Sequence, residues 1–586
     1  MKKITQFFFL ITLTLNTLAQ TDNWETYYEK SNFLETPRYQ QTIDYAKKLA
    51  NASEYIEYTT FGKSLQGRDL PLLIIDKNKN FTPESVKESG NAVLLIEACI
   101  HPGESEGKDA GLMLLRDIII QNKYPDLLKH TTILFIPIFN VDGHERFSPY
   151  NRINQNGPKE MGWRTTANNL NLNRDFLKAD ALEMQEWLKL FNQWLPDMFI
   201  DIHTTDGADY QYQLTYGMHT LGDMNKEQTD WQNNYLSEVE KKLLKDNVLM
   251  FPYVSFRQWH DPRSGLIRGT ASPRYSTGYV TNQNRPALLV ETHMLKDYKT
   301  RVDATYDLLK YTLEIIDNEY TDLKEINTSA DEESSNLAGK DFVLDYYTSQ
   351  EDSTTVKFKG VEYDIEPSDL TDGIWVKFSN KPKDYNLVLF DKILPAAQAK
   401  VPEAYIIPVE WTDVIERVKL HGIKYEALQE EKELEISTYR FTNVQFANYP
   451  FEGRQMVNDF NLEEVTIKKT FYPGSIIVPV NQRSAKIIAH MLEPQGPDSF
   501  VRWGFFNSIF ERKEYVETYV MEKMAREMIK ENPDLLDQYH QAVKNNPQIY
   551  NNQWAKLFWF YALTPYWDQQ KNIYPVGRIN NLEMLK

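Results

Sequence analysis

Cysteine is almost absent from this sequence: Cys99 is the only one in 586 residues. A single cysteine cannot form an internal disulfide, so the fold must rely on a core that is large enough without covalent cross-links. The composition can supply such a core, because 41% of the residues are hydrophobic and 13% are aromatic. A chain of this length also predicts more than one domain. Cys99 itself is predicted to be a small buried residue rather than a nucleophile.

An excess of positive charge is also missing. The 83 acidic residues outnumber the 65 basic ones and give a formal net charge of −18, which disfavours nucleic acids and other polyanions as partners. Gly207 and Gly217 form no phosphate loop. His144-Glu145 does not continue into the HExxH zinc motif, because Ser148 stands where the second histidine would be. The motifs of nucleotide-binding proteins and of the HExxH peptidases are therefore lacking.

The sequence contains no apolar run of the roughly 20 residues that a membrane crossing needs. It begins instead with the basic pair Lys2-Lys3, an apolar run over 7–15, and small residues up to Ala19. This order is typical of a secretory signal peptide over 1–19, cleaved near Ala19. It predicts a secreted or periplasmic protein with no stable membrane anchor after cleavage.

The strongest positive signal is a histidine and a glutamate three residues apart, His101 and Glu104, between an apolar run and a helix-like run. Pro102-Gly103 predicts a tight turn that folds Glu104 back toward His101. The positive end of the following helix favours the carboxylate over its acid form, and a metal ligand must be deprotonated. His203, in a second strand-like run, is a third ligand candidate. Three side chains with a fourth position left to water are typical of a catalytic zinc site.

Other polar residues stand after or at the end of further strand-like runs. They are the turn Asn140-Val141-Asp142-Gly143, Arg164 in Gly162-Trp163-Arg164, the pair Asn173-Arg174, and Glu291 at the end of the apolar run 286–290. In open α/β sheets, ligands bind at the carboxyl ends of the strands. A glutamate there is poorly placed for packing, which favours a functional role for Glu291.

In their order and strand context, these motifs resemble those of the zinc metallocarboxypeptidases, the carboxypeptidase A-like family. The resemblance covers roughly residues 40 to 320 and begins with Gly62-Lys63-Ser64-Leu65-Gln66-Gly67-Arg68, which is similar to an early hairpin of that family. It implies that His101, Glu104 and His203 hold one zinc ion in each catalytic site.

The resemblance also implies roles for the other polar residues. Glu291 would be the general base that takes a proton from the metal-bound water. Arg164 would stabilise the oxyanion that forms during hydrolysis. Asn173 and Arg174 would bind the free carboxylate of the substrate, to which a guanidinium offers two parallel donors.

One residue of the family pattern has no clear counterpart. The family usually supplies a mobile tyrosine shortly before the strand that carries the base. Tyr275 and Tyr279 stand in that region, at spacings that do not match. The lid role stays open between Tyr275, Tyr279 and neither.

The sequence therefore predicts an exported, zinc-dependent metallocarboxypeptidase that removes C-terminal residues from peptides with a free carboxylate. A related zinc amidohydrolase, acting on cell-wall peptides or N-acyl amino acids, would use the same zinc and Glu291 and stays an alternative. A non-catalytic peptide-binding module on the same fold is the alternative from another class. The intact ligands and base argue against that module.

Alternating strand and helix patterns over 20–325 predict an α/β catalytic domain with a mixed, mostly parallel sheet flanked by helices. A polar stretch predicts a linker over 326–340. Short apolar runs separated by turn signals predict a strand-rich accessory domain over 341–480. Helical periodicity returns over 481–586, which predicts a helical C-terminal region.

Overall fold

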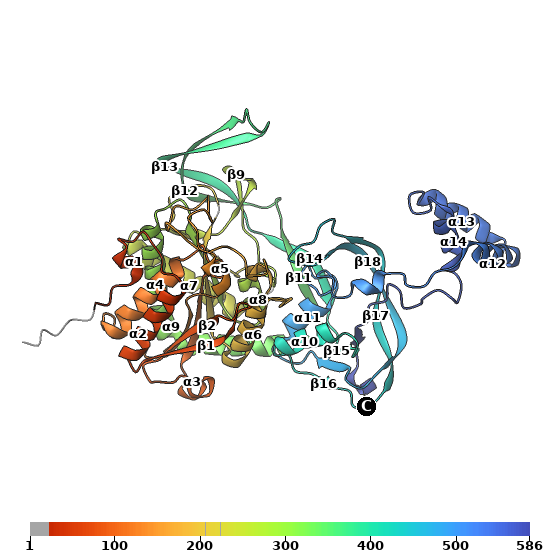
Figure 1. Cartoon of the computed structure of the whole chain (residues 1–586), viewed down its shortest axis with the longest axis horizontal. Coiled ribbons are helices and arrows are strands. Elements are labelled where there is room, and N and C mark those ends of the chain that lie inside the picture. Colours follow the sequence, from red (N-terminus) through yellow and green to blue (C-terminus); the bar gives the residue numbers. More distant parts are fainter. Residues whose placement is uncertain (1–22, 206, 223, 586) are drawn as a thin grey trace, which may run out of the picture.

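The computed structural model describes residues 23–205, 207–222 and 224–585. The predicted signal peptide and its cleavage position lie outside the described residues. Figure 1 shows three parts along the long axis of the molecule: a large α/β part formed by the N-terminal half, a β-rich part, and an arm of helices at the far end. Among the described residues, no helix combines the length and apolarity needed to cross a membrane.

The N-terminal part is built on an eight-stranded sheet with the order β1-β2-β4-β3-β5-β10-β6-β7. The four central strands β4, β3, β5 and β10 run parallel to one another, and antiparallel pairs flank them. β3 and β5 are buried along their whole length, as expected for parallel strands covered on both faces. The predicted mixed, mostly parallel sheet is confirmed. Its strands are β1 (Ile56–Lys63), β2 (Asp69–Ile75), β3 (Ala92–Ala98), β4 (Thr131–Ile136), β5 (Met198–Thr205), β6 (Leu214–Met218), β7 (Met250–Pro252) and β10 (Ala287–His293).

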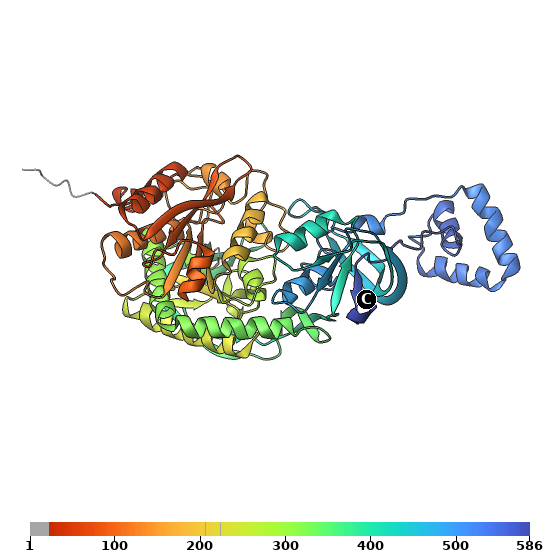
Figure 2. The same cartoon turned by 90° about the horizontal axis from the view of Figure 1, so that it is seen from below.

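Helices cover both faces of this sheet. One face carries α2 (Tyr39–Ala52), α4 (Glu106–Leu115), α7 (Lys226–Lys245) and α9 (Tyr298–Ser335). The other face carries α6 (Leu182–Trp194) and α8 (Ser276–Asn282). Figure 2 shows the long helix α9, in green, along the lower edge of this part. Shorter helical segments are α1 (Tyr27–Lys30), α3 (Pro83–Ser89), α5 (Val141–Glu145) and the π-helical turn Arg116–Ile120 that extends α4.

The segment predicted to be a linker is largely helical. Residues 326–335 form the last part of α9, so the polar stretch does not interrupt the helix. Two of its polar residues are buried and hydrogen-bonded: Asn327 donates to a main-chain carbonyl just before β5 at 2.9 Å, and the hydroxyl of Ser334 donates to the carbonyl of Arg483 at 2.8 Å. These side chains are buried through hydrogen bonds and not through apolar contacts. A pattern of apolar residues therefore does not reveal that this segment is helical.

The region after α9 is rich in strands, as predicted. Six strands form a second sheet with the order β16-β19-β15-β20-β17-β18. β12 and β13 form a long hairpin that joins β9 and β8 of the N-terminal half in a four-stranded sheet and projects from the molecule (Figure 1). The strands are β8 (Ser255–Gln258), β9 (Asp261–Ile267), β11 (Asp341–Thr348), β12 (Thr354–Pro367), β13 (Ile374–Phe390), β14 (Ile393–Lys400), β15 (Ala404–Ile407), β16 (Glu426–Ala427), β17 (Lys432–Phe446), β18 (Val457–Phe471), β19 (Ile476–Pro479) and β20 (Gly577–Ile579).

The predicted helical C-terminal region is also present. Helices α12 (Thr518–Glu531), α13 (Asp534–Asn545) and α14 (Gln553–Tyr561) form the arm at the far end of the molecule (Figure 1). After the arm the chain returns to the second sheet, because β20 pairs with β15 and β17. Two further helices, α10 (Thr412–Leu420) and α11 (Ala485–Leu492), lie between the two sheets.

One hydrophobic core continues from the N-terminal sheet into the C-terminal half. Trp187 of α6 and Tyr279 of α8 belong to the same buried cluster as Val414 and Val418 of α10. The hydroxyl of Tyr279 lies 2.8 Å from Nδ1 of His421, which directly follows α10. The change of architecture near residue 340 is therefore bridged by close packing, and the two halves form one packed unit.

Candidate metal centre and active site

Three side chains converge at the carboxyl end of two neighbouring central strands. β3 and β5 pair in register up to Ala98 and Ile202, so the turn after β3 brings His101 next to His203 of β5. Within that turn the main-chain N–H of Glu104 donates to the carbonyl of His101 at 2.9 Å. The predicted tight turn is thus present, and it returns the carboxylate to the histidine. All three side chains are buried.

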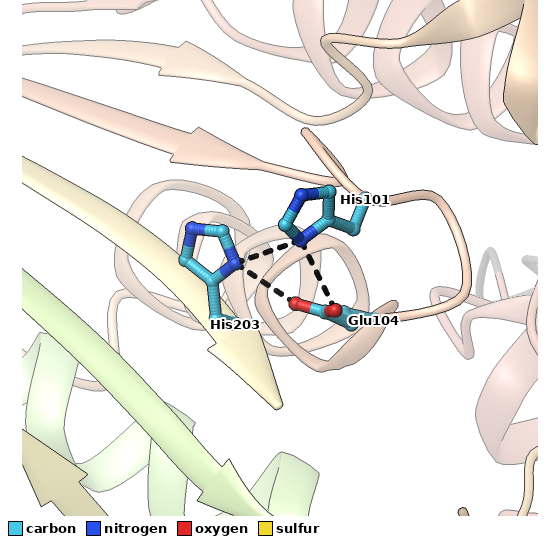
Figure 3. A group of neighbouring side chains, drawn as sticks. All are labelled: His101, Glu104 and His203. Atoms are coloured by element: carbon cyan, nitrogen blue, oxygen red, sulfur yellow. Dashed lines mark hydrogen bonds and ion pairs between the residues drawn. The ribbon is translucent and has the colours of Figure 1, made fainter. Parts of the chain in front are cut away.

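The ligand atoms of these side chains face one another (Figure 3). Nδ1 of His101 lies 3.1 Å from Oε1 of Glu104, and Nδ1 of His203 lies 2.9 Å from Oε2 of Glu104. The two Nδ1 atoms are 3.2 Å apart. His101, Glu104 and His203 form the one group of three or more potential ligands found among the described residues.

The far side of each imidazole determines which nitrogen carries the proton. Nε2 of His203 lies 2.7 Å from a carboxylate oxygen of Asp201, so Nε2 carries a hydrogen. Nε2 of His101 lies 3.0 Å from Oδ1 of Asn171, an oxygen that also accepts the N–H of Asn173. Such outer partners fix the tautomer of metal-binding histidines. In the neutral rings, both Nδ1 atoms therefore present lone pairs toward Glu104.

This arrangement fits a zinc ion. Zinc–ligand bonds of about 2.0–2.1 Å in a tetrahedron separate the ligand atoms by about 3.3–3.4 Å, close to the distances between the three donors here. When both rings are neutral, two lone pairs and a carboxylate converge on one point, which is the deprotonated donor set that a metal cation binds. Two histidines and one glutamate are a donor set that catalytic zinc sites use, with the fourth position open to water.

Buried charges and their partners set the protonation of the cluster. Burial lowers the pKa of His101 to about 4. Burial also opposes charging of His203, but the carboxylates of Asp201 and Glu104 outweigh it and raise the pKa of His203 well above its usual value. For Glu104, burial favours the neutral acid, but the Arg152 guanidinium and the two imidazoles hold the pKa well below its usual range. Glu104 is therefore ionised, as a metal ligand must be.

Arg152 is a site residue that the sequence does not reveal. Its Nη2 atom donates to Oε1 of Glu104 at 2.5 Å. The side chain passes over Gly103, where an added Cβ would lie 2.8 Å from Nε of Arg152. A glycine beside a predicted ligand is the one local signal of this close approach. Nothing in the sequence shows that a residue 48 positions away fills the space.

Glu291 lies beside the cluster on the next strand. β10 pairs with β5 in parallel register, with Glu291 opposite His203. Paired residues of neighbouring strands point to the same face of a sheet at a strand spacing of about 4.8 Å. Glu291 is 9% exposed, compared with 2% for His203. Glu291 is therefore buried next to the coordination site.

Two further arginines line the same region. Nη1 of Arg164 lies 3.6 Å from Oε1 of Glu104, and its side chain is 43% exposed. The guanidinium of Arg174 donates to the carbonyl of Asn173 at 2.7 Å and lies 4.5 Å from the ring centre of Tyr275. Burial lowers the pKa of Arg164, and the nearby guanidiniums of Arg152 and Arg174 lower it further. The three arginines form a concentrated positive charge in an otherwise acidic chain.

Asn173 is buried at the site, about as deeply as Glu291. Its Oδ1 accepts the main-chain N–H of Ser276 at 3.0 Å. Its Nδ2 lies 3.4 Å from Nε2 of His203. The structure thus brings Asn173 to the site, but with its amide directed toward His203 and the start of α8.

The two tyrosine candidates for a lid have different surroundings. Tyr279 has no exposed surface, and its hydroxyl contacts His421 and Gln283 inside the core. A residue in this position cannot swing over a substrate. Tyr275 is partly exposed and stacks on Arg174. Of the two, only Tyr275 lies at the site.

The early hairpin and the Asn-x-Asp-Gly turn contact each other, and the turn packs against the segment that carries Arg164. Asp142 accepts hydrogen bonds from the hydroxyl of Ser64 at 2.8 Å and from Arg68 at 2.6 Å. Gly143 packs so tightly against the main chain of 163–165 that an added Cβ would lie 2.4 Å from the carbonyl of Thr165. These motifs therefore fix the segment that carries Arg164.

Comparison with known proteins agrees with this geometry. A zinc carboxypeptidase family model matches residues 42–247, which include the three ligand candidates, Arg164 and Asn173-Arg174. Carboxypeptidase 2 of Trichophyton rubrum is 22% identical over 489 residues, which cover 80% of this chain and 84% of that protein. Carboxypeptidase 2 of Trichophyton equinum is 22% identical over 492 residues, with the same shares.

Similar solved structures include two carboxypeptidases. The metallo-carboxypeptidase from Burkholderia cenocepacia has 16% identity and a TM-score of 0.36, and the match covers 48% of this chain and 69% of that one. Carboxypeptidase A from Helicoverpa armigera has 13% identity and a TM-score of 0.37, with 50% and 74% covered.

The matched family is zinc-dependent, and His101, Glu104 and His203 can hold one such ion. The fungal relatives match well beyond residues 42–247, so their likeness extends into the C-terminal half. Together with the converging ligands, these matches show that the chain is similar to zinc carboxypeptidases, which are peptide hydrolases, over residues 42–247, and to two fungal carboxypeptidases over most of its length.

Proposed function

We propose that this chain is an exported metallocarboxypeptidase that releases single C-terminal residues from peptides with a free carboxylate. The observation that carries the proposal is the convergence of two imidazole lone pairs and one carboxylate at distances of 2.9–3.2 Å, with Glu291 in register beside His203. An acid next to a three-ligand metal position is what hydrolysis by an activated water needs.

Each residue has a role in this proposal. Bound to His101, Glu104 and His203, zinc would supply a water of nearly neutral pKa, about 7, and polarise the substrate carbonyl. Glu291 accepts the proton of the attacking water and passes it to the leaving amine. Arg164, exposed beside Glu104, donates to the oxygen on which negative charge develops. No covalent intermediate is needed.

The positive charge around the site supports a substrate with a free carboxylate. Arg152, Arg164 and Arg174 gather there, whereas the chain as a whole carries a formal net charge of −18. A guanidinium binds a carboxylate through two parallel hydrogen bonds. Arg174 holds its position through Asn173 and Tyr275 and is the residue that we assign to the terminal carboxylate. We assign Asn173 to orienting Arg174, whose guanidinium donates to the main-chain carbonyl of Asn173.

Export is the second part of the proposal. It rests on Lys2-Lys3, the apolar run over 7–15 and the small residues that end at Ala19. Intact-mass measurement of the protein secreted from a bacterial host tests it. A mature chain that begins near Gln20 is expected, and a chain that retains residues 1–19 would contradict it.

A peptide pair that differs only at its C-terminus tests the activity. N-blocked peptides ending in a free carboxylate or in a carboxamide are incubated with the full chain, with and without a chelator, and the products are identified by mass spectrometry. Stepwise loss of C-terminal residues from the free acid alone, abolished by the chelator and restored by zinc, is expected. Equal cleavage of the carboxamide would refute carboxypeptidase action, and cleavage of small N-acyl amino acids alone would favour the amidohydrolase.

A further inference from the structure

The hairpin between β17 and β18 reaches from the C-terminal half to the metal site. Phe451 and Arg454 exchange two main-chain hydrogen bonds, of 2.9 and 3.0 Å, around a two-residue turn. The turn residues are Glu452, with φ +49°, and Gly453, with φ +76°. Positive φ at both positions is the signature of a type I′ hairpin turn.

A glutamate is an unfavourable choice for this turn. Type I′ turns favour Asn, Asp or Gly at the first position, because other residues are strained in the left-handed region. A side chain longer than that of Asn or Asp is strained in this region. An asparagine would form the same turn with less strain. Because strained residues cluster at functional sites, Glu452 needs an explanation other than the turn itself.

The explanation lies in what Glu452 contacts. Its Oε2 accepts the main-chain N–H of Asn171 at 2.8 Å. Oδ1 of Asn171 is the acceptor that lies 3.0 Å from Nε2 of His101. An added Cβ at Gly453 would lie 3.7 Å from Leu170, so the tip of the hairpin rests on the same segment. A continuous chain of hydrogen bonds thus runs from Glu452 through Asn171 to His101.

The hairpin is also anchored next to its tip. Both Nε and Nη2 of Arg454 donate to the carboxylate of Asp180, each at 2.6 Å. Arg417, on α10, donates to the same carboxylate at 3.1 Å. The tip is therefore held on the segment 170–180 by charge-assisted bonds, which restrict where Glu452 can lie.

We propose that Glu452 is a positioning residue of the metal site. It orients Asn171 so that Asn171 accepts the Nε2 proton of His101 and Nδ1 of His101 faces the metal. This inference deepens the proposed function and depends on it for the identity of the ligands. The C-terminal half thereby contributes one carboxylate to the site. Asn171 and His101 lie between this carboxylate and the metal position. Groups bonded directly to a metal ligand, as Asn171 is, change metal affinity by about 10- to 100-fold when they are lost, and Glu452 acts through Asn171.

Glu452→Asn in the full-length chain separates this role from a structural one. Asn suits the turn, but its side chain is one methylene shorter and loses the N–H of Asn171. We expect zinc affinity, measured by competition with a chromogenic chelator, to fall about 10- to 100-fold. The melting temperature of the metal-free protein should stay equal or rise. Glu452→Gln keeps an oxygen at full reach and should bind zinc within a few fold of the wild type.

Glu463→Asn is the matched control. Glu463 is exposed on β18, beyond the hairpin tip, and the variant should bind zinc like the wild type. Amide hydrogen exchange of the peptide that contains Asn171 adds a readout that needs no metal. We expect faster exchange in metal-free Glu452→Asn than in the wild type.

Wild-type zinc affinity in Glu452→Asn, or unchanged exchange at Asn171, would overturn the inference. Glu452→Gly offers the same loss of the carboxylate in a residue equally suited to the turn, and serves if the Asn variant does not fold. Both readouts are taken without substrate. A wild-type protein that binds zinc but trims no peptide would therefore refute the proposed function. The role of Glu452 would still be decided by zinc affinity and amide exchange.

Discussion

Glu291 and His203 occupy paired positions on two parallel strands, β10 and β5. Both strands are largely buried, and β5 is the fully buried neighbour of β3, which leads to the turn with His101 and Glu104. The distance between the acid and the metal position is therefore set by the sheet itself and not by a loop. Sites built on rigid elements hold catalytic geometry best.

Glu291→Gln should keep zinc and lose turnover. The amide has nearly the same shape, but it cannot accept a proton from water. We expect kcat to fall by about 10²- to 10⁴-fold, with zinc content unchanged by elemental analysis. Glu57→Gln, an exposed change on β1, should match the wild type in both. Loss of zinc together with activity would instead make Glu291 part of the metal site.

Arg164 and Arg174 should affect different kinetic constants. Arg164→Ala removes a donor that acts mainly in the transition state, so we expect kcat to fall about 10²- to 10³-fold with KM little changed. Arg174→Ala removes a charge-assisted contact with the terminal carboxylate, so KM should rise about 10- to 100-fold. Steady-state kinetics on one N-blocked dipeptide distinguishes the two. The reverse pattern would exchange the two assignments.

Tyr275 and Tyr279 can be separated by a similar pair of variants. Tyr279→Phe leaves the buried Nδ1 of His421 without its partner, and we expect a loss of about 1–3 kcal/mol in unfolding free energy with KM unchanged. Tyr275→Ala removes the ring beside Arg174, and KM should rise by up to about fivefold, with little change in stability. Urea unfolding and kinetics on the same preparations measure both effects. An altered KM in Tyr279→Phe would contradict its placement in the core.

The contact between the two halves should depend on pH through Asp180. Burial would raise the pKa of Asp180, but Arg454, Lys178 and Arg417 outweigh it and lower the pKa to about 2. Because the folded pKa lies below the unfolded value of about 3.8, the stabilisation is complete above pH ~4 and is lost as the pH falls toward ~2. Asp180→Asn should therefore lose about 2 kcal/mol of unfolding free energy at pH ~7.

The deficit of Asp180→Asn should shrink as the pH is lowered from ~5 to ~3. Urea titrations at several pH values measure it. Asp126, an exposed residue paired with Lys129, provides the control: Asp126→Asn should leave the unfolding free energy unchanged. A deficit that stays constant down to low pH would show that the ionised form of Asp180 does not carry the stabilisation.

The sequence was sufficient for the parts of the fold and site that depend on local pattern. Apolar runs predict the central strands, and the spacing of His101 and Glu104 around Pro102-Gly103 predicts the turn that brings two ligands together. Strand ends also point to His203 and Glu291, because ligands bind at the carboxyl ends of strands in open α/β sheets, where a polar side chain is poorly placed for packing.

Contacts between distant loops could not be predicted in the same way. Arg152 reaches Glu104 from an irregular segment, and Glu452 reaches Asn171 across 281 positions of sequence. Neither pairing follows from periodicity, since both depend on how separate elements dock. The sequence predicts a linker at the polar end of α9 for a related reason: Asn327 and Ser334 are buried through hydrogen bonds that a single sequence does not display.

The core shared by α6, α8 and α10 has a consequence for how this protein can evolve. Tyr279 contacts His421, and the buried cluster that contains Tyr279 continues into Val414 and Val418 of the C-terminal half. A lineage that lost everything after Ser335 would expose this side of the cluster to water, with the aggregation that such an apolar surface brings. Recombination therefore could not exchange the C-terminal half without disrupting the shared core. We expect the two halves to be inherited together and to evolve together.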